Sequence, residues 1–182
     1  LLSDAGEMAD DAGTLSDSLL TGFGTAGVTY GTFESVALTL GSGADSLIVN
    51  STISGSTTIT TGAGADVVTV QTTGGVLSLS TGDDADAISL RSVSASATVN
   101  AGLGDDTVSV SSDAPANLGT LNSLSASLTV NGEGGTDSLL FSDLGDMLNG
   151  SGSLSGTSLT GFGTSGVTYG TFESVGLTLG GG

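Results

Sequence analysis

The sequence has no cysteine, no histidine and no lysine, and Arg91 is its only basic residue. Without cysteine, the chain can form no disulfide, thiolate metal site or thiol nucleophile. Without histidine, cysteine or lysine, a serine-based catalytic relay cannot be assembled in the usual way. Nineteen acidic residues give a net charge of −18, and phosphate binding needs cationic side chains, so nucleic acid is excluded as a partner.

Long apolar runs are also missing. No segment approaches the length of a membrane span, and the N-terminal residues have neither the basic flank nor the apolar core of a signal peptide. We therefore expect no membrane span and place any export signal outside these residues. The chain is nevertheless 37% hydrophobic, with Val, Ile and Leu in alternating runs, which argues against disorder.

Five segments share one pattern, in which an aliphatic residue, a glycine-rich turn and an aspartate are followed by alternating aliphatic residues. The aspartates fall 21, 20, 20 and 31 residues apart, at Asp45, Asp66, Asp86, Asp106 and Asp137. A fixed period near twenty residues indicates stacked structural repeats. Each repeat is too short to bury a core alone, so neighbouring repeats must pack on one another.

Successive strand residues point to opposite faces, so the alternation identifies the buried positions. Seven residues before each aspartate stand Leu38, Ile59, Leu79, Val99 and Val130. Two residues after stand Leu47, Val68, Ile88, Val108 and Leu139, and four after stand Val49, Val70, Leu90, Val110 and Phe141. A fourth column, Val36, Thr57, Leu77, Ala97 and Leu128, is mixed. The pattern predicts an all-β, right-handed parallel β-solenoid, like a β-roll or β-helix, with about 20 residues per two-stranded rung.

A second, longer repeat spans the chain. Residues 1–43 return as residues 140–182 at a constant offset of 139, and 29 of the 43 aligned pairs are identical. This identity is typical of tandem duplication. We expect the sequence to be an excerpt, about one unit and a third, from a longer array of 139-residue units.

Three segments, the second of them with a loop insertion, follow from these patterns. Residues 1–27 are rich in Gly, Ser and Asp and are expected to form an irregular excursion with at most a short helix. Residues 28–141 form the rungs, and residues 112–122, with the only proline, form a loop insertion that accounts for the 31-residue spacing. Residues 142–182 begin the next tandem repeat.

In stacked rungs the five aspartates form one column along an edge, about 5 Å apart. Two unit charges at that distance repel by roughly 3 kcal/mol at an effective dielectric near 20. The column therefore requires bound cations or strongly raised pKa values. Oxygen ligands without nitrogen or sulfur select Ca²⁺, which also accepts backbone carbonyls. The candidate metal-binding residues are Asp45, Asp66, Asp84, Asp86, Asp106 and Asp137 with Gly41, Gly43, Gly62, Gly64, Gly82, Gly102 and Gly104.

The turns resemble the RTX, or hemolysin-type, calcium-binding repeat, whose nonapeptide is Gly-Gly-x-Gly-x-Asp-x-aliphatic-x. Segments 41–47, 62–68 and 102–108 fit it from the second glycine onward. The resemblance covers about half of the chain. It implies calcium held between stacked turns, export in an unfolded state and folding in external calcium, in a large secreted bacterial repeat protein.

The sequence departs from that family at several positions. The first glycine is replaced by Leu40, Thr61, Thr81 and Ala101, and Asp84 and Glu133 occupy other glycine positions. The motif recurs every twenty residues rather than every nine, so one edge, not both, should carry ions.

Other interpretations remain open at this stage. Aspartate also suits a glycine-rich turn without binding metal, and Asp10, Asp11, Asp143 and Asp146 are expected to be solvated loop charges. The Ser and Thr columns could form an ice-binding or glycan-binding face, or simply the solvent side of the strands. Paired carboxylates can hydrolyse glycosides, but repetition at every rung is typical of a scaffold.

The sequence thus favours a calcium-binding structural or adhesive repeat of a giant secreted bacterial surface protein or extracellular filament, and not an enzyme. Its expected partners are calcium ions, neighbouring copies of the repeat and cell-surface glycans. The alternatives are a non-catalytic calcium-binding solenoid module attached to a secreted enzyme, and an ice-binding or glycan-binding face.

Overall fold

The computed structural model describes residues 1–148 and 150–181, which form an all-β fold of two nine-stranded sheets. Asn149 and Gly182, within the segment expected to begin the next repeat, lie outside the described residues. The described part of the chain contains no helix long and apolar enough to cross a membrane.

The first sheet combines parallel strands with an antiparallel meander at one end. Its spatial order is β1 (Leu2–Ser3), β5 (Ser35–Thr39), β7 (Ser56–Ala63), β9 (Val76–Asp83), β11 (Ala97–Leu103), β13 (Leu128–Gly134), β17 (Thr164–Gly170), β16 (Ser158–Gly161) and β15 (Gly152–Leu154). Strands β15, β16 and β17 pair antiparallel, and all the other pairs are parallel.

The second sheet also combines parallel strands with an antiparallel meander, which lies at the N-terminal end of the stack rather than at its C-terminal end. Its spatial order is β18 (Ser174–Leu179), β14 (Ser138–Asp143), β12 (Thr107–Val110), β10 (Ala87–Leu90), β8 (Val67–Val70), β6 (Ser46–Val49), β2 (Ala12–Leu15), β3 (Leu19–Gly22) and β4 (Thr25–Thr29). Here β2, β3 and β4 pair antiparallel.

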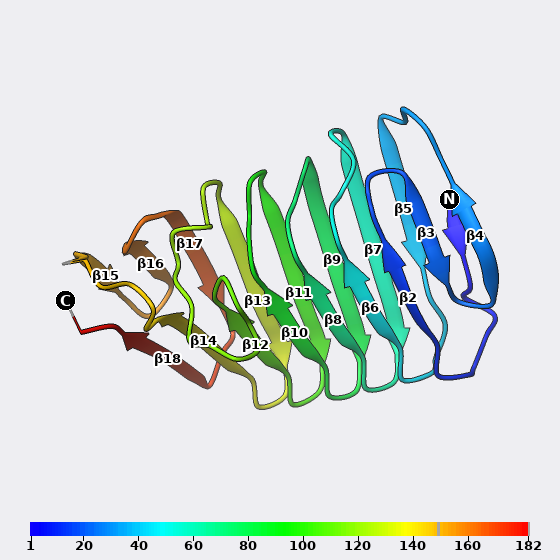
Figure 1. The fold of residues 1–182 in the computed structure, drawn as a ribbon. Helices are drawn as coiled ribbons and strands as arrows, with labels where there is room; N and C mark the ends of the chain where they lie inside the picture. The colour runs from blue at the N-terminus through cyan, green and yellow to red at the C-terminus, as the bar shows by residue number, and fades with distance from the viewer. Residues whose placement is uncertain (149, 182) are drawn as a thin grey trace.

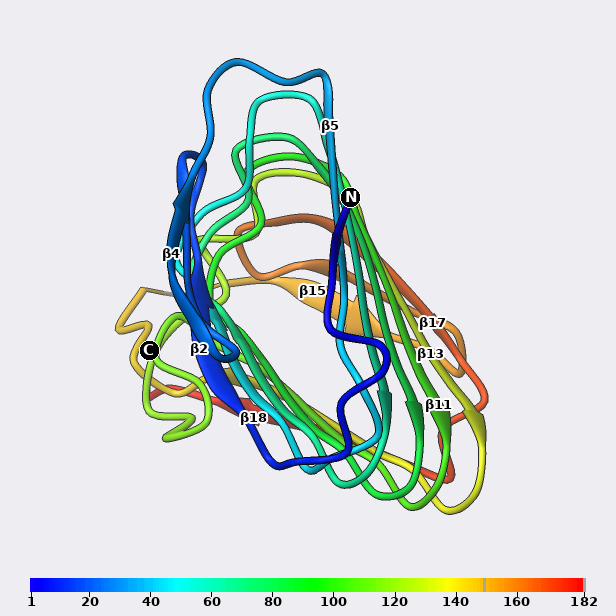
Figure 2. The ribbon, with the colours of Figure 1, turned by 90° about the vertical axis from the view of Figure 1, so that its right-hand side faces the viewer.

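From β5 to β14 the chain alternates between the sheets, so each pass adds one strand to each. Figure 1 shows these passes side by side, and Figure 2, viewed from the N-terminal end, shows that they overlie one another. Equivalent residues pair without a slip, for example Ile59 with Leu79 and Val68 with Ile88. This register is the one that the twenty-residue period predicts.

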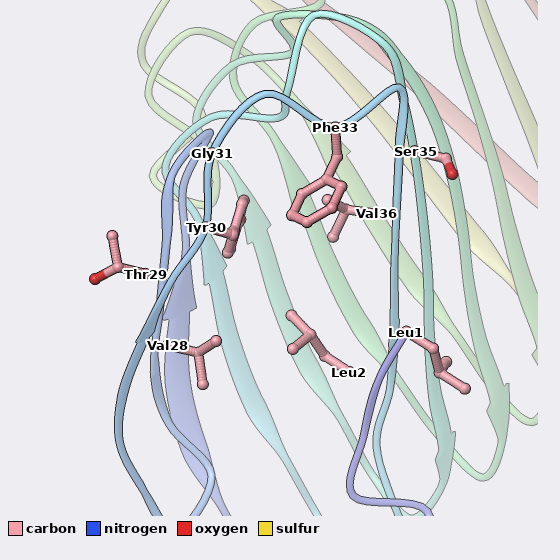
Figure 3. A pocket seen from close by; sticks show the side chains of 9 residues that line it. All are labelled: Leu1, Leu2, Val28, Thr29, Tyr30, Gly31, Phe33, Ser35 and Val36. Atoms are coloured by element: carbon pink, nitrogen blue, oxygen red, sulfur yellow. The ribbon is translucent and has the colours of Figure 1, made fainter.

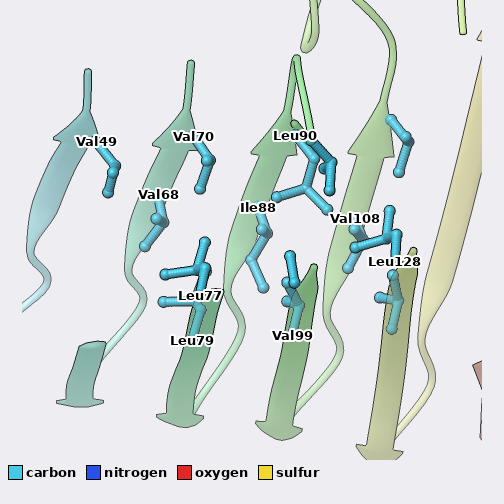
Figure 4. Close-up of a cluster of buried hydrophobic side chains, with 14 of the residues drawn as sticks. Val49, Val68, Val70, Leu77, Leu79, Ile88, Leu90, Val99, Val108 and Leu128 are labelled. Atoms are coloured by element: carbon cyan, nitrogen blue, oxygen red, sulfur yellow. The ribbon is translucent and has the colours of Figure 1, made fainter. Parts of the chain in front are cut away.

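The core lies between the sheets and consists of the predicted aliphatic columns (Figure 4). Every residue of the three aliphatic columns is at most 2% exposed, and the mixed fourth column is buried as well. Side chains of one column stack at the strand spacing of about 4.8 Å, so each rung covers the apolar side chains of the one before it.

The expectation of an irregular segment at residues 1–27 is wrong. This segment contains β1, β2, β3 and the beginning of β4, and β2 pairs in parallel with β6. Strand pairing dominates here although Gly, Ser and Thr supply little apolar alternation. The meander closes on Phe23, whose ring packs where Gly13 leaves room: a Cβ at Gly13 would lie 2.1 Å from it.

Residues 112–122 contain no strand, and the only base of the chain helps to hold them. Nε of Arg91 donates to the carbonyl of Ala114 at 2.7 Å, and Nη1 donates to Gln71 Oε1 at 3.1 Å. The Asp113 carboxylate accepts from the amide of Gly119 at 2.8 Å. The loop is thereby fixed to the adjacent passes of the chain.

Candidate functional site: the aspartate ladder

The five aspartates of the repeated motif, which we call the aspartate ladder, lie at equivalent places in successive passes. Each directly precedes a strand of the second sheet, after the turn that leaves the first sheet. Their side chains are buried rather than directed to water, with exposures of 4% or less at Asp45, Asp66, Asp86, Asp106 and Asp137.

One oxygen of each carboxylate accepts a hydrogen bond from the preceding rung. The amide of Asp45 donates to Asp66 Oδ1 at 2.7 Å, and the amide of Asp66 donates to Asp86 Oδ1 at 2.8 Å. The same bond runs from Asp86 to Asp106 at 2.8 Å and from Asp106 to Asp137 at 2.9 Å. The ladder therefore ties successive turns together through backbone amides.

Two residues that the sequence analysis did not place in the ladder extend this arrangement at its ends, Glu173 through its carboxylate and Asp11 through its backbone amide. The amide of Asp137 donates to Glu173 Oε2 at 2.7 Å, and the amide of Asp11 donates to Asp45 Oδ1 at 2.9 Å. Glu173 stands directly before β18, as Asp137 stands directly before β14. An acid placed immediately before a strand was the signal that could have identified it.

Within the described residues, the second oxygen of four of the ladder carboxylates has no hydrogen-bond partner. Oδ2 of Asp66, Asp86, Asp106 and Asp137 is buried and makes no hydrogen bond. The hydroxyls of Thr61 and Thr81 lie close enough to the carboxyls of Asp66 and Asp86 to favour their charged forms. Each hydroxyl nevertheless donates its one proton to a backbone carbonyl, Thr61 to that of Thr81 at 2.9 Å and Thr81 to that of Ala101 at 2.6 Å. Leaving a buried anionic oxygen unpaired is costly, so each of these atoms requires a cation or a proton.

Burial raises the pKa of the carboxyls of Asp45, Asp66, Asp86 and Asp106, because the charged form loses its hydration. Desolvation, augmented by the charges of Asp66 and Asp106, raises the pKa of Asp86 to about 7. The pKa values of Asp45, Asp66 and Asp106 are also raised, primarily by desolvation and further by neighbouring acids. The central rungs therefore resist holding their full charge unaided.

The glycines named as candidate ligands form close-packed columns beside the ladder. Gly62, Gly82 and Gly102 have φ between +109° and +116°, and a Cβ at Gly82 would lie 1.7 Å from the carbonyl oxygen of Gly62. Gly41 does not share the positive φ of these three glycines, and it is required because a Cβ would lie 2.1 Å from the carbonyl oxygen of Glu7.

A second column contains Gly43, Gly64, Asp84 and Gly104. A Cβ at Gly64 would lie 2.4 Å from the carbonyl oxygen of Gly43, and one at Gly104 would lie 2.1 Å from that of Asp84. Asp84 adopts the glycine-like φ of +77°, and its exposed carboxylate accepts from the amide of Gly64 at 3.2 Å. Asp84 thus lies outside the buried row of ladder oxygens.

The candidate ligands are of the type that a hard cation prefers, because every side-chain or backbone ligand atom is an oxygen. Within the described residues, no group of three or more acidic side chains converges on a point. An interval between two rungs therefore offers two carboxylates, and backbone carbonyls and water would have to supply the other ligands of a six-coordinate ion.

Asp143, expected to be a solvated loop charge, is instead 3% exposed. Its Oδ1 accepts from the amide of Leu121 at 2.9 Å, and desolvation raises its pKa. The loop of residues 112–122 folds back over β14 and covers this carboxyl. The sequence around Asp143 alone could not indicate that contact. Asp10 is exposed, and Asp11 and Asp146 are partly exposed.

Comparison of the chain with protein-family models, curated proteins and solved structures finds no match.

Proposed function

We propose that this chain is a structural segment of an extracellular repeat array, folded as a right-handed parallel β-solenoid whose aspartate ladder takes up Ca²⁺. The function is mechanical: it provides a stiff, extended support rather than a catalytic centre. We place this array on a bacterial cell surface or in an extracellular filament.

The observation that carries this proposal is the row of unpartnered Oδ2 atoms, one per rung, at Asp66, Asp86, Asp106 and Asp137. A single orphaned carboxylate could be a local accident. Four at the same position in successive rungs are a property of the repeat, and each adds a negative charge about 4.8 Å from the next. A divalent ion shared between two rungs would compensate two of these charges at once.

Calcium fits the donors better than magnesium. Calcium accepts six to eight oxygens in flexible geometry and takes backbone carbonyls readily, whereas magnesium requires a nearly ideal octahedron and keeps its water. The Oδ2 atoms and carbonyls of the glycine turns would hold the ion, while Oδ1 keeps its bond to the backbone amide. Extracellular modules bind calcium at about 10⁻⁴–10⁻³ M, which suits an array that is completed outside the cell.

Calcium titration of the chain, followed by circular dichroism and isothermal titration calorimetry with magnesium as control, tests the proposal. We expect calcium to bind in the submillimolar to millimolar range and to raise the unfolding temperature, with a much weaker effect of magnesium. A fold whose stability is indifferent to calcium at neutral pH, with no heat of binding, would overturn the calcium assignment and leave protons as the compensating ions.

A further inference from the structure

The two copies of the repeated block fold alike but lie in opposite sheets. Strands β2, β3 and β4, the first meander, form one end of the second sheet, and β15, β16 and β17, the second meander, form an end of the first sheet. The strand that follows each meander also changes sheet, since β5 lies in the first and β18 in the second. One sequence is thus seen in two settings.

The meander itself is the same structure in both settings. Leu15 pairs with Leu20 as Leu154 pairs with Leu159, and both copies have the same register shift between their second and third strands. The side chain of Tyr30 donates to the carbonyl of Ser16, and that of Tyr169 donates to the carbonyl of Ser155. The meander therefore keeps the same internal pairing whichever rung it joins.

The two meanders are paired on opposite edges. The first is joined through β2 to β6, with β4 as the last strand of its sheet. The second is joined through β17, the equivalent of β4, to β13, with β15 as the last strand. One element thus pairs with the rung before it in one copy and with the rung after it in the other.

Burial changes with the pairing. Leu15 is 1% exposed where β6 stacks on β2, but its equivalent Leu154 is 39% exposed on the outer strand. Conversely, Val28 is partly exposed on β4, and its equivalent Val167 is 2% exposed beside β13. Each copy leaves open the apolar surface that is covered in the other.

The strands on either side of each meander show the same exchange of sheets, because β1 and β5 pair in the first sheet and β14 and β18 pair in the second. Leu2 pairs with Leu38 in β1 and β5, and their equivalents Phe141 and Leu177 pair in β14 and β18. Within its sheet, β5 is covered by the neighbouring strand β7, whereas β18 is an edge strand. Accordingly, Leu40 is 2% exposed and its equivalent Leu179 is 49% exposed.

An apolar hollow of about 420 Å³ lies at the N-terminal end, lined by residues that include Leu2, Val28, Tyr30 and Val36 (Figure 3). In the second copy the equivalent side chains are packed: Phe141 and Tyr169 have ring centroids 5.8 Å apart, and Val167 and Tyr169 pair with Leu128 and Val130 of β13. The occupant that this hollow fits is therefore the last rung of another copy of the same unit.

We infer that successive 139-residue units join without a boundary and exchange sheets at each junction. The first sheet of one unit continues through the meander into the second sheet of the next, while the second sheet continues through the β18 equivalent into the first. Both junction halves are visible in this chain, with matching registers. Because the sheets exchange once per unit, the structural period of an array is two units.

The test is an extended chain in which residues 1–182 are followed by a further copy of residues 44–182. Thr14 pairs with Ile48 across β2 and β6, so Ser153, the equivalent of Thr14, should pair with Ile48 of the added copy. With Ser153→Cys in the first copy and Ile48→Cys in the added copy, we expect mild oxidation to crosslink most of the protein. The matched control carries Ile48→Cys in the first copy, at the far end of the stack, and should remain reduced.

Hydrogen exchange of the extended chain without cysteines provides a second measurement. The amide of Leu40 donates to the carbonyl of Thr60 at 2.9 Å. The equivalent amide of Leu179 gains this partner from the added copy, so its exchange should slow at least tenfold relative to the 182-residue chain. An unchanged rate at Leu179 would overturn the inference, as would failure of the crosslink in a folded extended chain.

This inference rests on the proposal that the unit is a repeated structural element but not on calcium. If the chain binds calcium but the extended chain does not form the crosslink, the inferred junction is wrong and the calcium assignment stands. If the crosslink forms but calcium does not bind, the calcium assignment is wrong and the junction stands.

Discussion

The amide of Asp66 donates to Asp86 Oδ1 at 2.8 Å, while Oδ2 of the same Asp86 carboxylate is buried without a partner. One side chain thus has two roles, since one oxygen closes the backbone of the preceding turn and the other requires a counter-ion. Like charges one strand spacing apart repel by roughly 3 kcal/mol at an effective dielectric of 20. The ladder is therefore a stabilising feature only when its charge is compensated.

Without divalent ions, the stability of the chain should rise as the pH falls from about 7 toward 4. Asp86 has a pKa raised from 3.8 to about 7 in the folded state, so the folded chain binds its proton more tightly than the unfolded chain does. This stabilisation is fully present below the unfolded pKa and is lost as the pH rises through the folded pKa. Urea unfolding in chelator across this range measures the effect, and maximal stability at pH 7 would contradict it.

Substitution Asp86→Asn should keep the hydrogen bond and remove the charge, because the amide oxygen can still accept from the amide of Asp66. In chelator at pH 7 we expect the free energy of unfolding to rise by roughly 1–3 kcal/mol, the scale of the repulsion between neighbouring rungs. Calcium should stabilise this variant less than it stabilises the parent chain. Asp83→Asn, an exposed acid of the same turn, is the matched control. Equal effects of the two substitutions on calcium binding would show that only net charge matters.

Gly82→Ala should destabilise the fold by at least about 2 kcal/mol. The residue has a φ of +109°, which side chains rarely adopt, and its Cβ would lie 1.7 Å from the carbonyl oxygen of Gly62. Gly31→Ala, where a Cβ meets nothing within 4 Å, is the control and should change stability little. Thermal unfolding distinguishes the two, and a Gly82→Ala protein as stable as the parent would refute the close stacking of the turns.

The adjacent residues Val67 and Val68 provide a test of the inward and outward faces of β8. Val68 is fully buried and Val67 is 49% exposed. Val68→Ala should cost about 2 kcal/mol for two buried methyl groups and the cavity that they leave, whereas Val67→Ala should stay within about 0.5 kcal/mol. Similar losses at both positions in denaturant unfolding would contradict the assigned register.

The sequence was sufficient to predict the rung register and the core, because one period repeats and strand alternation is strict at positions such as Ile59 and Leu79. It also placed the ladder aspartates in one column. It could not show that Asp86 turns inward and accepts an amide from the preceding rung, since that depends on the path of the turn. Asp143 was misjudged because a distant loop covers it.

The meanders were missed for a different reason. Leu15 and Leu20 are buried in the first meander, but the residues between them are Ser16, Asp17, Ser18 and the exposed Leu19, so the local pattern resembles a loop. Their pairing depends on contacts that form only when the chain folds back on itself, including the packing of the Phe23 ring in the room that Gly13 leaves. The change of sheet between the two copies depends on tertiary packing and has no signature in either sequence block.

The most direct test of the central claim is a crystal structure grown in calcium, with anomalous scattering used to locate the ions. The account predicts calcium between successive turns, within about 2.3–2.6 Å of Oδ2 atoms of the ladder, such as those of Asp66 and Asp86. Anomalous peaks confined to exposed acids such as Asp83 and Asp84, with no ion beside the buried Oδ2 atoms, would contradict it.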